Sequence, residues 1–432
     1  MGKFKILRIS QLAYPKALIA FESKHPEVQI LPYEEQKRLF FSEKLVYSDS
    51  FSRAMRQLGH EADEIVCDVD WIQKTWAKEN SVNYSDSSWQ EEILLSQISK
   101  IRPEILYFQH NPPLPYSVWK NLKHTCPSIK KILVHRAFPG NFNTLGAADL
   151  LMVGTRRLVS QYADHDIKAK LLYHYFDEAV PDLLHQPQIK YSLTFLGSSG
   201  FGHGLNHATR YWLLRAVLEQ TQAKMWLEEP LRSLPSANST QRVKHVLASI
   251  VRGFVNYLPR TSQKNLGNAA WLPLKVRDLI QSDYKQIDLR PTGLKVPEKR
   301  LLDLFPQRCH PSVYGLDYYE VIANSLISFN CHTDAAVDQV GNMRMFQATG
   351  MGSCLLTDTG DNMSDLFEED KEVVTYSSKE EALEKIDYLL QNETKCREIA
   401  SAGQKRTLRD HTALRRCEQI DEWLQEMVFK SF

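Results

Sequence analysis

Short apolar segments alternate with segments of helical spacing along almost the whole chain, and this alternation restricts the fold more than any other feature. Strands buried in parallel sheets are short apolar runs, whereas amphipathic helices repeat apolar residues three and four positions apart. Strands that alternate with helices are typical of βαβ units. We therefore predict the α/β class, with doubly wound parallel sheets.

The predicted elements extend over both halves of the chain. Strands are predicted at Phe4–Ile9, Glu64–Cys67, Ile105–Phe108, Lys131–Val134, Asp149–Val153, Leu171–Tyr175, Leu193–Leu196, Lys224–Leu227, Leu326–Asn330, Ser353–Leu356 and Glu372–Tyr376. Helices are predicted at Glu34–Leu58, Trp89–Ile101, Tyr116–Leu122, Arg156–Tyr162, His207–Glu219, Val243–Val255, Leu274–Ile280, Leu316–Ser325, Lys379–Leu390, Cys396–Leu408 and Ala413–Met427.

The length of 432 residues is too great for one ordinary core and predicts two domains. A proline-containing stretch with few apolar residues, 177–189, is the expected connection between them. We predict an N-terminal Rossmann-like domain over 1–185 and a C-terminal one over 186–410. The terminal helix within 411–432 is expected to pack back on the first domain.

Bulk charge and cysteine usage exclude several classes of protein. The net charge is +1, which does not favour nucleic acid as a partner. No apolar run approaches the roughly 20 residues that span a bilayer, so any membrane contact is expected to be peripheral. The seven cysteines are scattered and include no Cys-x-x-Cys pair. This pattern predicts a reducing, cytoplasmic location and no structural zinc site.

The segment 342–358 combines two features that gather at ligand sites of α/β proteins. Asn342 is a good N-cap for a short helix, and Asp358 stands where the next strand ends. Ligands of open α/β sheets lie beside helix N-termini and the carboxyl ends of strands. Arg344, in the first helical turn, opposes the helix dipole, so it needs either an anionic ligand or an ion-pair partner.

Polar residues after other predicted strands are further candidates. Gly197 and Ser198 begin a Gly- and Ser-rich loop, and Arg210 lies near the start of the helix after it. The loop lacks both the P-loop ending and the dinucleotide-binding glycine pattern. His332 follows the strand that ends at Asn330.

Two histidines of the first half also follow predicted strands. His110 comes after the strand ending at Phe108, and His135 after the strand ending at Val134. Each is a candidate to bind a ligand at the carboxyl edge of the sheet, with a buried structural histidine as the alternative. No short ligand spacing connects the histidines, so we predict no bound metal.

Several motifs carry a resemblance to a known family. They lie at 195–198, 313–334, 342–352 and 399–412, with looser matches at 33–36, 76–79 and 103–109. These segments resemble the GT-B glycosyltransferases, in particular the spore-maturation-protein-like (CgeB-like) branch related to glycosyltransferase group 1. The resemblance implies two Rossmann-like domains that face each other across a cleft.

The resemblance also implies a function and a set of site residues. It implies transfer of a sugar from a nucleotide-sugar donor to a carbohydrate or other hydroxyl acceptor, in polysaccharide or glycoconjugate synthesis. The reaction is expected to retain anomeric configuration and to need no metal or cofactor. The implied catalytic residues are His135, His110 and His332. The implied donor-binding residues are Gly197, Ser198, Arg210, Asn330, His332, Asn342, Met343, Arg344 and Gln347.

One position departs from the family pattern. Gln347 stands where an acidic residue of the wider group binds the ribose, and Gln339 lies eight residues before it. A glutamine can still hydrogen-bond a hydroxyl, but without the charge-assisted bond. The departure keeps two alternatives open: a non-catalytic nucleotide- or sugar-binding module on the same scaffold, and, with less support, a nucleotide-sugar epimerase.

Overall fold

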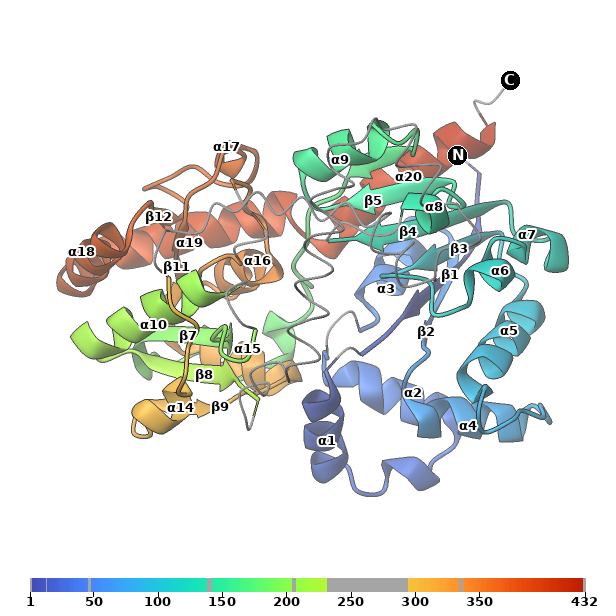
Figure 1. Ribbon diagram of the computed structural model, residues 1–432, viewed down its shortest axis with the longest axis horizontal. Coiled ribbons are helices and arrows are strands. Elements are labelled where there is room, and N and C mark those ends of the chain that lie inside the picture. The colour runs from blue at the N-terminus through green and yellow to red at the C-terminus, as the bar shows by residue number, and fades with distance from the viewer. Residues whose placement is uncertain are drawn as a thin grey trace.

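Two lobes, each built on its own six-stranded sheet, make up the molecule (Figure 1). In this computed structural model of the chain, the structure describes residues 2–12, 14–45, 48–137, 142–203, 207–230, 294–333, 336 and 338–429. The helices predicted at Val243–Val255 and Leu274–Ile280 lie outside these residues. Within the described ranges, no helix is both long and apolar enough to cross a bilayer.

The first sheet is entirely parallel and has the strand order β2-β1-β3-β4-β5-β6. Its strands are β1 (Lys5–Ser10), β2 (Glu61–Val66), β3 (Ile105–Phe108), β4 (Lys131–Arg136), β5 (Leu150–Val153) and β6 (Ala169–Leu171). One face packs against α5 (Trp89–Ile101), α6 (Tyr116–Trp119), α7 (Leu122–Thr125), α8 (Phe142–Leu145) and α9 (Arg156–Ala163). The other face packs against α3 (Ser50–Gln57) and α20 (Ala413–Phe429). A further cluster holds α1 (Pro15–Lys24), α2 (Tyr33–Ser42) and α4 (Asp70–Glu79), with the 3-10 turn Val28–Ile30.

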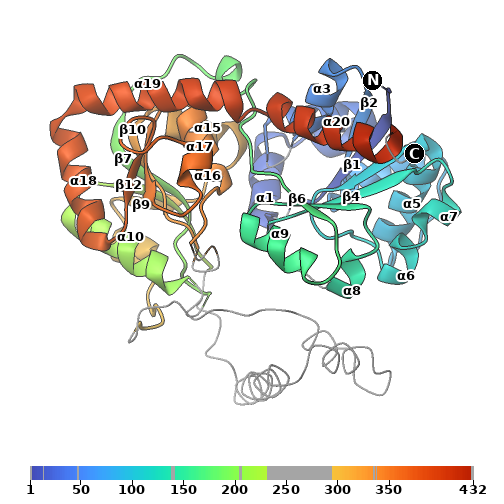
Figure 2. The same cartoon turned by 90° about the horizontal axis from the view of Figure 1, so that it is seen from above.

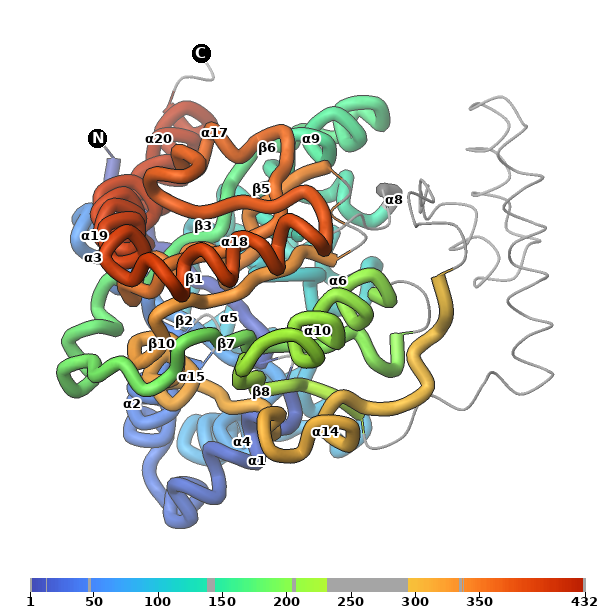
Figure 3. Tube along the Cα trace, turned by 90° about the vertical axis from the view of Figure 1, so that its left-hand side faces the viewer, coloured from blue at the N-terminus to red at the C-terminus, as the bar shows by residue number. Residues whose placement is uncertain are grey.

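The second sheet is also parallel and has the order β12-β11-β10-β7-β8-β9. Its strands are β7 (Tyr191–Ser198), β8 (Lys224–Glu228), β9 (Cys309–Pro311), β10 (Ser325–Phe329), β11 (Cys354–Asp358) and β12 (Val374–Tyr376). One face is covered by α10 (Ala208–Gln220), α14 (Leu301–Leu304), α18 (Lys379–Gln391) and α19 (Glu393–Asp410), with α10 and α18 side by side (Figure 3). The other is covered by α15 (Gly315–Ala323), α16 (Met343–Gly350) and α17 (Met363–Leu366). The predicted α/β class with doubly wound parallel sheets is confirmed.

The helix predicted over Glu34–Leu58 is wrong in its middle. The structure has α2 and α3, separated by residues 43–49. The side chain of Ser48 donates a hydrogen bond to the carbonyl of Phe41 (2.9 Å), and the Ser48 carbonyl accepts one from Arg8 (2.7 Å). Since these bonds satisfy backbone groups that a continuous helix would have used, they favour the break.

The strand predicted over Leu171–Tyr175 is also wrong, because β6 ends at Leu171. The chain after it leaves the sheet and crosses between the lobes. At Phe176 it meets the second crossing, between α19 and α20. Phe176 accepts a hydrogen bond from Ala413 N–H (2.9 Å) and donates one to the His411 carbonyl (2.8 Å). The crossings therefore lie side by side, and α19 and α20 run from one lobe to the other (Figure 2).

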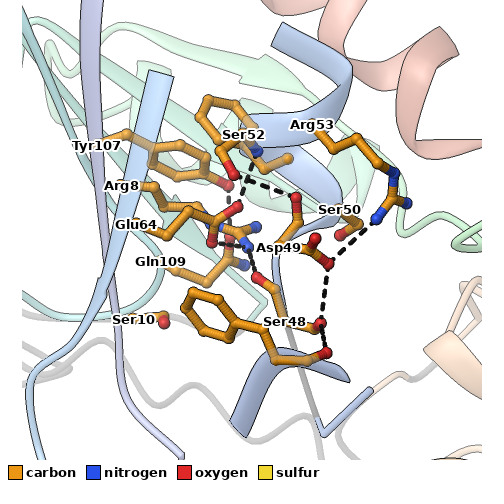
Figure 4. Close-up of polar contacts among 12 residues, drawn as sticks. Arg8, Ser10, Ser48, Asp49, Ser50, Ser52, Arg53, Glu64, Tyr107 and Gln109 are labelled. Carbon is orange, nitrogen blue, oxygen red and sulfur yellow. Dashed lines mark hydrogen bonds and ion pairs between the residues drawn. The ribbon is translucent and has the colours of Figure 1, made fainter. Parts of the chain in front are cut away.

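A buried ion pair joins β1 and β2 within the first lobe (Figure 4). Arg8 is fully buried on β1 and donates from Nε to Glu64 Oε2 (2.8 Å), while Glu64 Oε1 accepts from the Ser52 N–H (2.7 Å). Burial lowers the pKa of Arg8, but the adjacent carboxylate outweighs it, so the net pKa is raised. Arg8 also holds the Ser48 carbonyl, and Glu43, at the end of α2, contacts the second lobe: its carbonyl accepts from the Leu316 N–H (2.9 Å).

Candidate functional site

The second sheet has one point where its strand order reverses. From β7 the chain adds β8 and β9 on one side, and then β10, β11 and β12 on the other. Parallel sheets bind ligands at such a switch point, outside the carboxyl ends of the two central strands. Here Gly197 and Ser198, predicted to begin the loop, are instead the last residues of β7, the loop starts at Ser199, and Asn330 follows β10. This edge is therefore the expected ligand crevice of the lobe.

Two arginines bridge the two loops at this switch point. Arg210, in the first turn of α10, donates to the carbonyls of Ser198 (3.3 Å) and Cys331 (2.8 Å). Arg344, in the first turn of α16, donates from Nη1 to Asn330 Oδ1 (2.8 Å). Its guanidinium lies over the Phe195 ring, with Cζ 4.6 Å from the ring centroid. Two cations from two helices thus converge on one small region.

The two guanidinium groups have no carboxylate partner among the described residues. Arg210 is only 6% exposed, and the Nε atoms of both arginines are buried without a hydrogen-bond partner. Two more buried polar atoms lack partners near the start of α10: His207 Nδ1 and Thr209 Oγ1. Burial lowers the pKa of Arg344; the neighbouring Tyr318 hydroxyl raises it, but the charge of Arg210 lowers it further, and the net pKa is lowered. Like charges held together without an acid require compensation, which an anionic ligand supplies.

Gly197 has a specific role in this arrangement. Its φ of +135° lies in a region that side chains disfavour, and a Cβ atom there would overlap the Arg344 guanidinium. A glycine is therefore needed for Arg344 to occupy its position. Ser198, the next residue, accepts from the Gly200 N–H through its hydroxyl (3.2 Å).

The N-terminus of α16 is capped as the sequence predicts. Asn342 Oδ1 accepts from the Met345 N–H (3.3 Å). His332, 8% exposed, lies against the same helix end, and its Nε2 accepts from the N–H groups of Gly341 (3.0 Å) and Asn342 (3.2 Å). Its proton is then on Nδ1, which donates to Asp358 Oδ1 (2.7 Å).

These contacts bear on the predicted binding of a donor by His332 and Asn342. Both nitrogens of His332 are engaged within the protein, and the backbone N–H groups at Asn342 already donate to it. The structure therefore gives His332 a positioning role for the start of α16. A contact of either group with a donor, as predicted, would have to replace these bonds.

Gln347 and Met343 also lie on α16. The Gln347 side chain is held by two tyrosines of α15: Oε1 accepts from Tyr318 (2.9 Å), and Nε2 donates to Tyr319 (3.2 Å). Each end of its amide thus has one partner within the protein, and the donor-binding role of Gln347 stays a prediction. Met343 is the partly buried first residue of the helix.

The two histidines of the first lobe lie at the carboxyl edge of the other sheet. His135, on β4, is 5% exposed; its Nδ1 meets Gln109 Nε2 (2.7 Å), and its ring is 5.7 Å from that of His174. His110 follows β3 with a φ of +151°. Burial, with Arg136 next, lowers the pKa of His110 to about 4, and burial lowers that of His135 well below its usual value.

The structure therefore divides the predicted residues into two groups. Gly197, Ser198, Arg210, Asn330, His332, Asn342 and Arg344 come together at the edge of the second sheet. His110 and His135 lie at the edge of the first. In the described part of the chain, no cluster of three or more His, Cys, Asp or Glu side chains has an arrangement that would hold a metal ion.

Sequence reasoning missed several supporting residues, although parallel register carries a signal for them. Ser198 is opposite Glu228, so the next residues, Ser199 and Glu229, are neighbours; the Ser199 hydroxyl donates to the buried Glu229 carboxylate. In the same way Phe329 is opposite Leu356, so two residues further on Cys331 is level with Asp358. The next residue, His332, is then within hydrogen-bond reach of Asp358. No pattern signals Phe195 or the two tyrosines of α15.

Comparisons with known proteins agree with this architecture. The crystal structure of HepE from Anabaena in complex with UDP-glucose superposes with a TM-score of 0.52 at 11% identity, covering 98% of this chain and all of that one. Its complex with UDP has a TM-score of 0.51 at 12% identity, with the same coverage. The fold is GT-B. Identities this low support the fold alone.

A family comparison adds evidence from the sequence. Residues 277–422 match the family model described as "Glycosyl transferase-like". The matched segment contains α15, β10, α16 and β11, and it is similar to that family over about a third of the chain. A search of curated proteins found no match. The closer resemblance to the spore-maturation branch stays a prediction.

Proposed function

We propose that this protein is a glycosyltransferase that moves a sugar from a nucleotide-sugar donor to a hydroxyl group of a carbohydrate or other acceptor. The C-terminal lobe binds the nucleotide diphosphate, and the N-terminal lobe binds the acceptor. Since HepE is described in complex with UDP-glucose and with UDP, a UDP-sugar is the first donor to test.

One observation carries the proposal: Arg210 and Arg344 converge at the switch point, and the described residues place no carboxylate against either of them. A nucleotide diphosphate carries at least two negative charges and presents oxygens that arginine forks bind well. Bound here, it would satisfy the unpartnered Nε atoms and relieve the repulsion between the two cations.

Arg210 and Arg344 would also assist breakage of the bond between the sugar and the diphosphate. When the bond between the sugar and the diphosphate breaks, negative charge builds up on the leaving group, and fixed cations stabilise it in the transition state. Two arginines supply the charge that a divalent ion supplies elsewhere, so we propose that the reaction needs no metal. Retention of the anomeric configuration is proposed on the family resemblance, and anomer-resolved NMR of the product tests it.

The setting of the reaction follows from further features. Closure of the cleft between the lobes would exclude water and so limit hydrolysis of the donor. All seven cysteines are unpaired and buried. Since thiols persist in reducing compartments, we place the reaction in the cytoplasm, in polysaccharide or glycoconjugate synthesis.

Donor turnover by the purified protein tests the proposal. A panel of UDP-sugars is incubated with and without candidate sugar acceptors, and release of UDP is measured. The proposal expects release that depends on an acceptor and that falls at least a hundredfold in Arg344→Ala. Arg215→Ala is the matched control, because Arg215 lies on α10 but pairs with Glu219 at the surface.

Other results identify the alternatives. UDP binding without release under any condition would favour a non-catalytic binding module, the alternative that Gln347 suggests. Conversion of the donor sugar without any acceptor would favour an epimerase. Binding of neither UDP nor a UDP-sugar would refute the proposed nucleotide site.

A further inference from the structure

A chain of hydrogen bonds at the edge of the first sheet ends on His135. The Tyr107 hydroxyl on β3 donates to Gln109 Oε1 (2.6 Å), and Gln109 Nε2 lies 2.7 Å from His135 Nδ1. All three residues are buried, at 2%, 2% and 5% exposure. Phe108 pairs with Val134 in the parallel register, so Gln109 and His135 follow as direct neighbours.

This chain determines which ring nitrogen carries the proton. An amide nitrogen can only donate, so His135 Nδ1 must accept, and the proton of the neutral ring is then on Nε2. The amide orientation agrees with the contact on its other side, where Gln109 Oε1 accepts from the Tyr107 hydroxyl. With the amide reversed, this hydrogen bond to the oxygen would be lost.

On the opposite side of the ring, His135 Nε2 is buried and has no hydrogen-bond partner among the residues that the structure describes. A buried N–H group in this state is destabilising, and such groups are rare in folded proteins unless a ligand completes them. The ring stays neutral, because burial and then the nearby His174 and His110 lower its pKa. His135 therefore presents one N–H donor at the carboxyl edge of a parallel sheet, where ligands bind.

We propose that Gln109 is a positioning residue that holds His135 as the Nε2–H tautomer, so that His135 donates a hydrogen bond to an oxygen of the bound sugar. In this tautomer His135 cannot remove a proton through Nε2, and it recognises a hydroxyl or ring oxygen as an acceptor. The sugar as ligand rests on the proposed function, whereas the tautomer does not depend on it.

Nitrogen-15 NMR of protein labelled at histidine, recorded without substrate near pH 7.5, tests the tautomer directly. The chain has 14 histidines, and loss of one signal in His135→Gln assigns the resonance. We expect a protonated Nε2 and an unprotonated Nδ1. A proton on Nδ1 in the native protein would overturn the inference, whether or not the protein turns over a donor.

Gln109→Glu tests the cause. A carboxylate only accepts, so it should draw the proton to Nδ1 and leave Nε2 bare or make the ring doubly protonated. We expect the NMR signature to change and kcat with UDP-glucose to fall at least tenfold, while the affinity for UDP, which has no sugar, changes less than twofold. Gln57→Glu is the control, because Gln57 is exposed at the end of α3.

The remaining outcomes are also decisive. An unchanged tautomer in Gln109→Glu would show that Gln109 does not set it. A changed tautomer with unchanged kcat would refute the contact between His135 and the sugar. If Gln109→Glu fails to fold, Tyr107→Phe replaces it, because loss of the phenol frees the amide to rotate and should give a mixture of tautomers. Turnover with the proton on Nδ1 would overturn this inference and leave the proposed function intact.

Discussion

Replacing Arg344 by alanine should separate ligand binding from stability. In the free protein, this arginine donates a hydrogen bond to Asn330, lies over the Phe195 ring and interacts with the Tyr318 hydroxyl. It also lies close enough to Arg210 for that charge to lower its pKa. The side chain thus contributes little to the fold and is positioned to act on an anion.

Magnitudes support this separation. A hydrogen bond to a charged group contributes about 1.5–3 kcal/mol, and a cation–π contact about 0.5–2 kcal/mol. Removing this partly buried cation also removes its repulsion with Arg210. The stability gained in this way is of the same order as the stability lost with the two contacts. The free energy of unfolding without ligand should therefore change by no more than about 2 kcal/mol. For a domain of this size, that corresponds to a shift in melting temperature of roughly 4–8 °C.

The effect on UDP binding should be much larger. Two unit charges about 4 Å apart interact by about 4 kcal/mol at an effective dielectric constant of about 20. Since each 1.4 kcal/mol is a factor of ten, loss of Arg344 should weaken UDP binding about a hundred- to a thousandfold. Lysine keeps the positive charge but lacks the forked guanidinium. The UDP affinity of Arg344→Lys should therefore lie between those of the native protein and Arg344→Ala.

Isothermal titration calorimetry with UDP gives the affinity, and a thermal melt without ligand gives the stability. Arg215→Ala serves as the control for removal of an arginine from the same lobe. The reasoning fails if Arg344→Ala binds UDP as the native protein does. It fails equally if the variant loses binding only because the lobe has unfolded.

Two further variants test the surroundings of the site. Gly197→Ala should displace the Arg344 guanidinium and weaken UDP binding to the level of Arg344→Ala. The double variant should bind UDP no more weakly than either single variant, which calorimetry can measure. Additive losses of binding free energy would refute the contact between Gly197 and Arg344. Burial raises the pKa of Asp358, but His332 lowers it more, so the folded-state pKa lies below the usual value. The stability from this carboxylate is present above about pH 4 and lost as the pH falls through the folded pKa. Asp358→Asn should therefore destabilise the protein at pH 6, with a difference that shrinks below about pH 4 in urea unfolding; a difference independent of pH would contradict this assignment.

Much of the fold was predictable because parallel strands are nearly continuous apolar runs. The bounds of β3 are those of the predicted strand Ile105–Phe108, and the bounds of α5 are those of the predicted helix Trp89–Ile101. Errors arose where tertiary contacts decide. Arg8 holds the loop that interrupts the predicted helix, and Phe176 draws the chain away from the first sheet.

The position of the site in the fold was predictable from the sequence, but the contacts between its side chains were not. Strand ends and helix starts located Arg344 and His332 near one edge, since that rule depends only on topology. Whether Arg344 meets an acid or another arginine depends on side chains from distant segments. For the same reason the sequence could not show that His332 binds Asp358 or that tyrosines hold Gln347.

The central claim is that Arg210 and Arg344 bind the diphosphate of a nucleotide without a metal. Calorimetric titration of the native protein with UDP and with uridine, both in excess EDTA, tests it most directly. The account predicts that UDP binds at least a hundredfold more tightly than uridine, because uridine lacks the phosphates. UDP that binds no more tightly than uridine would contradict it.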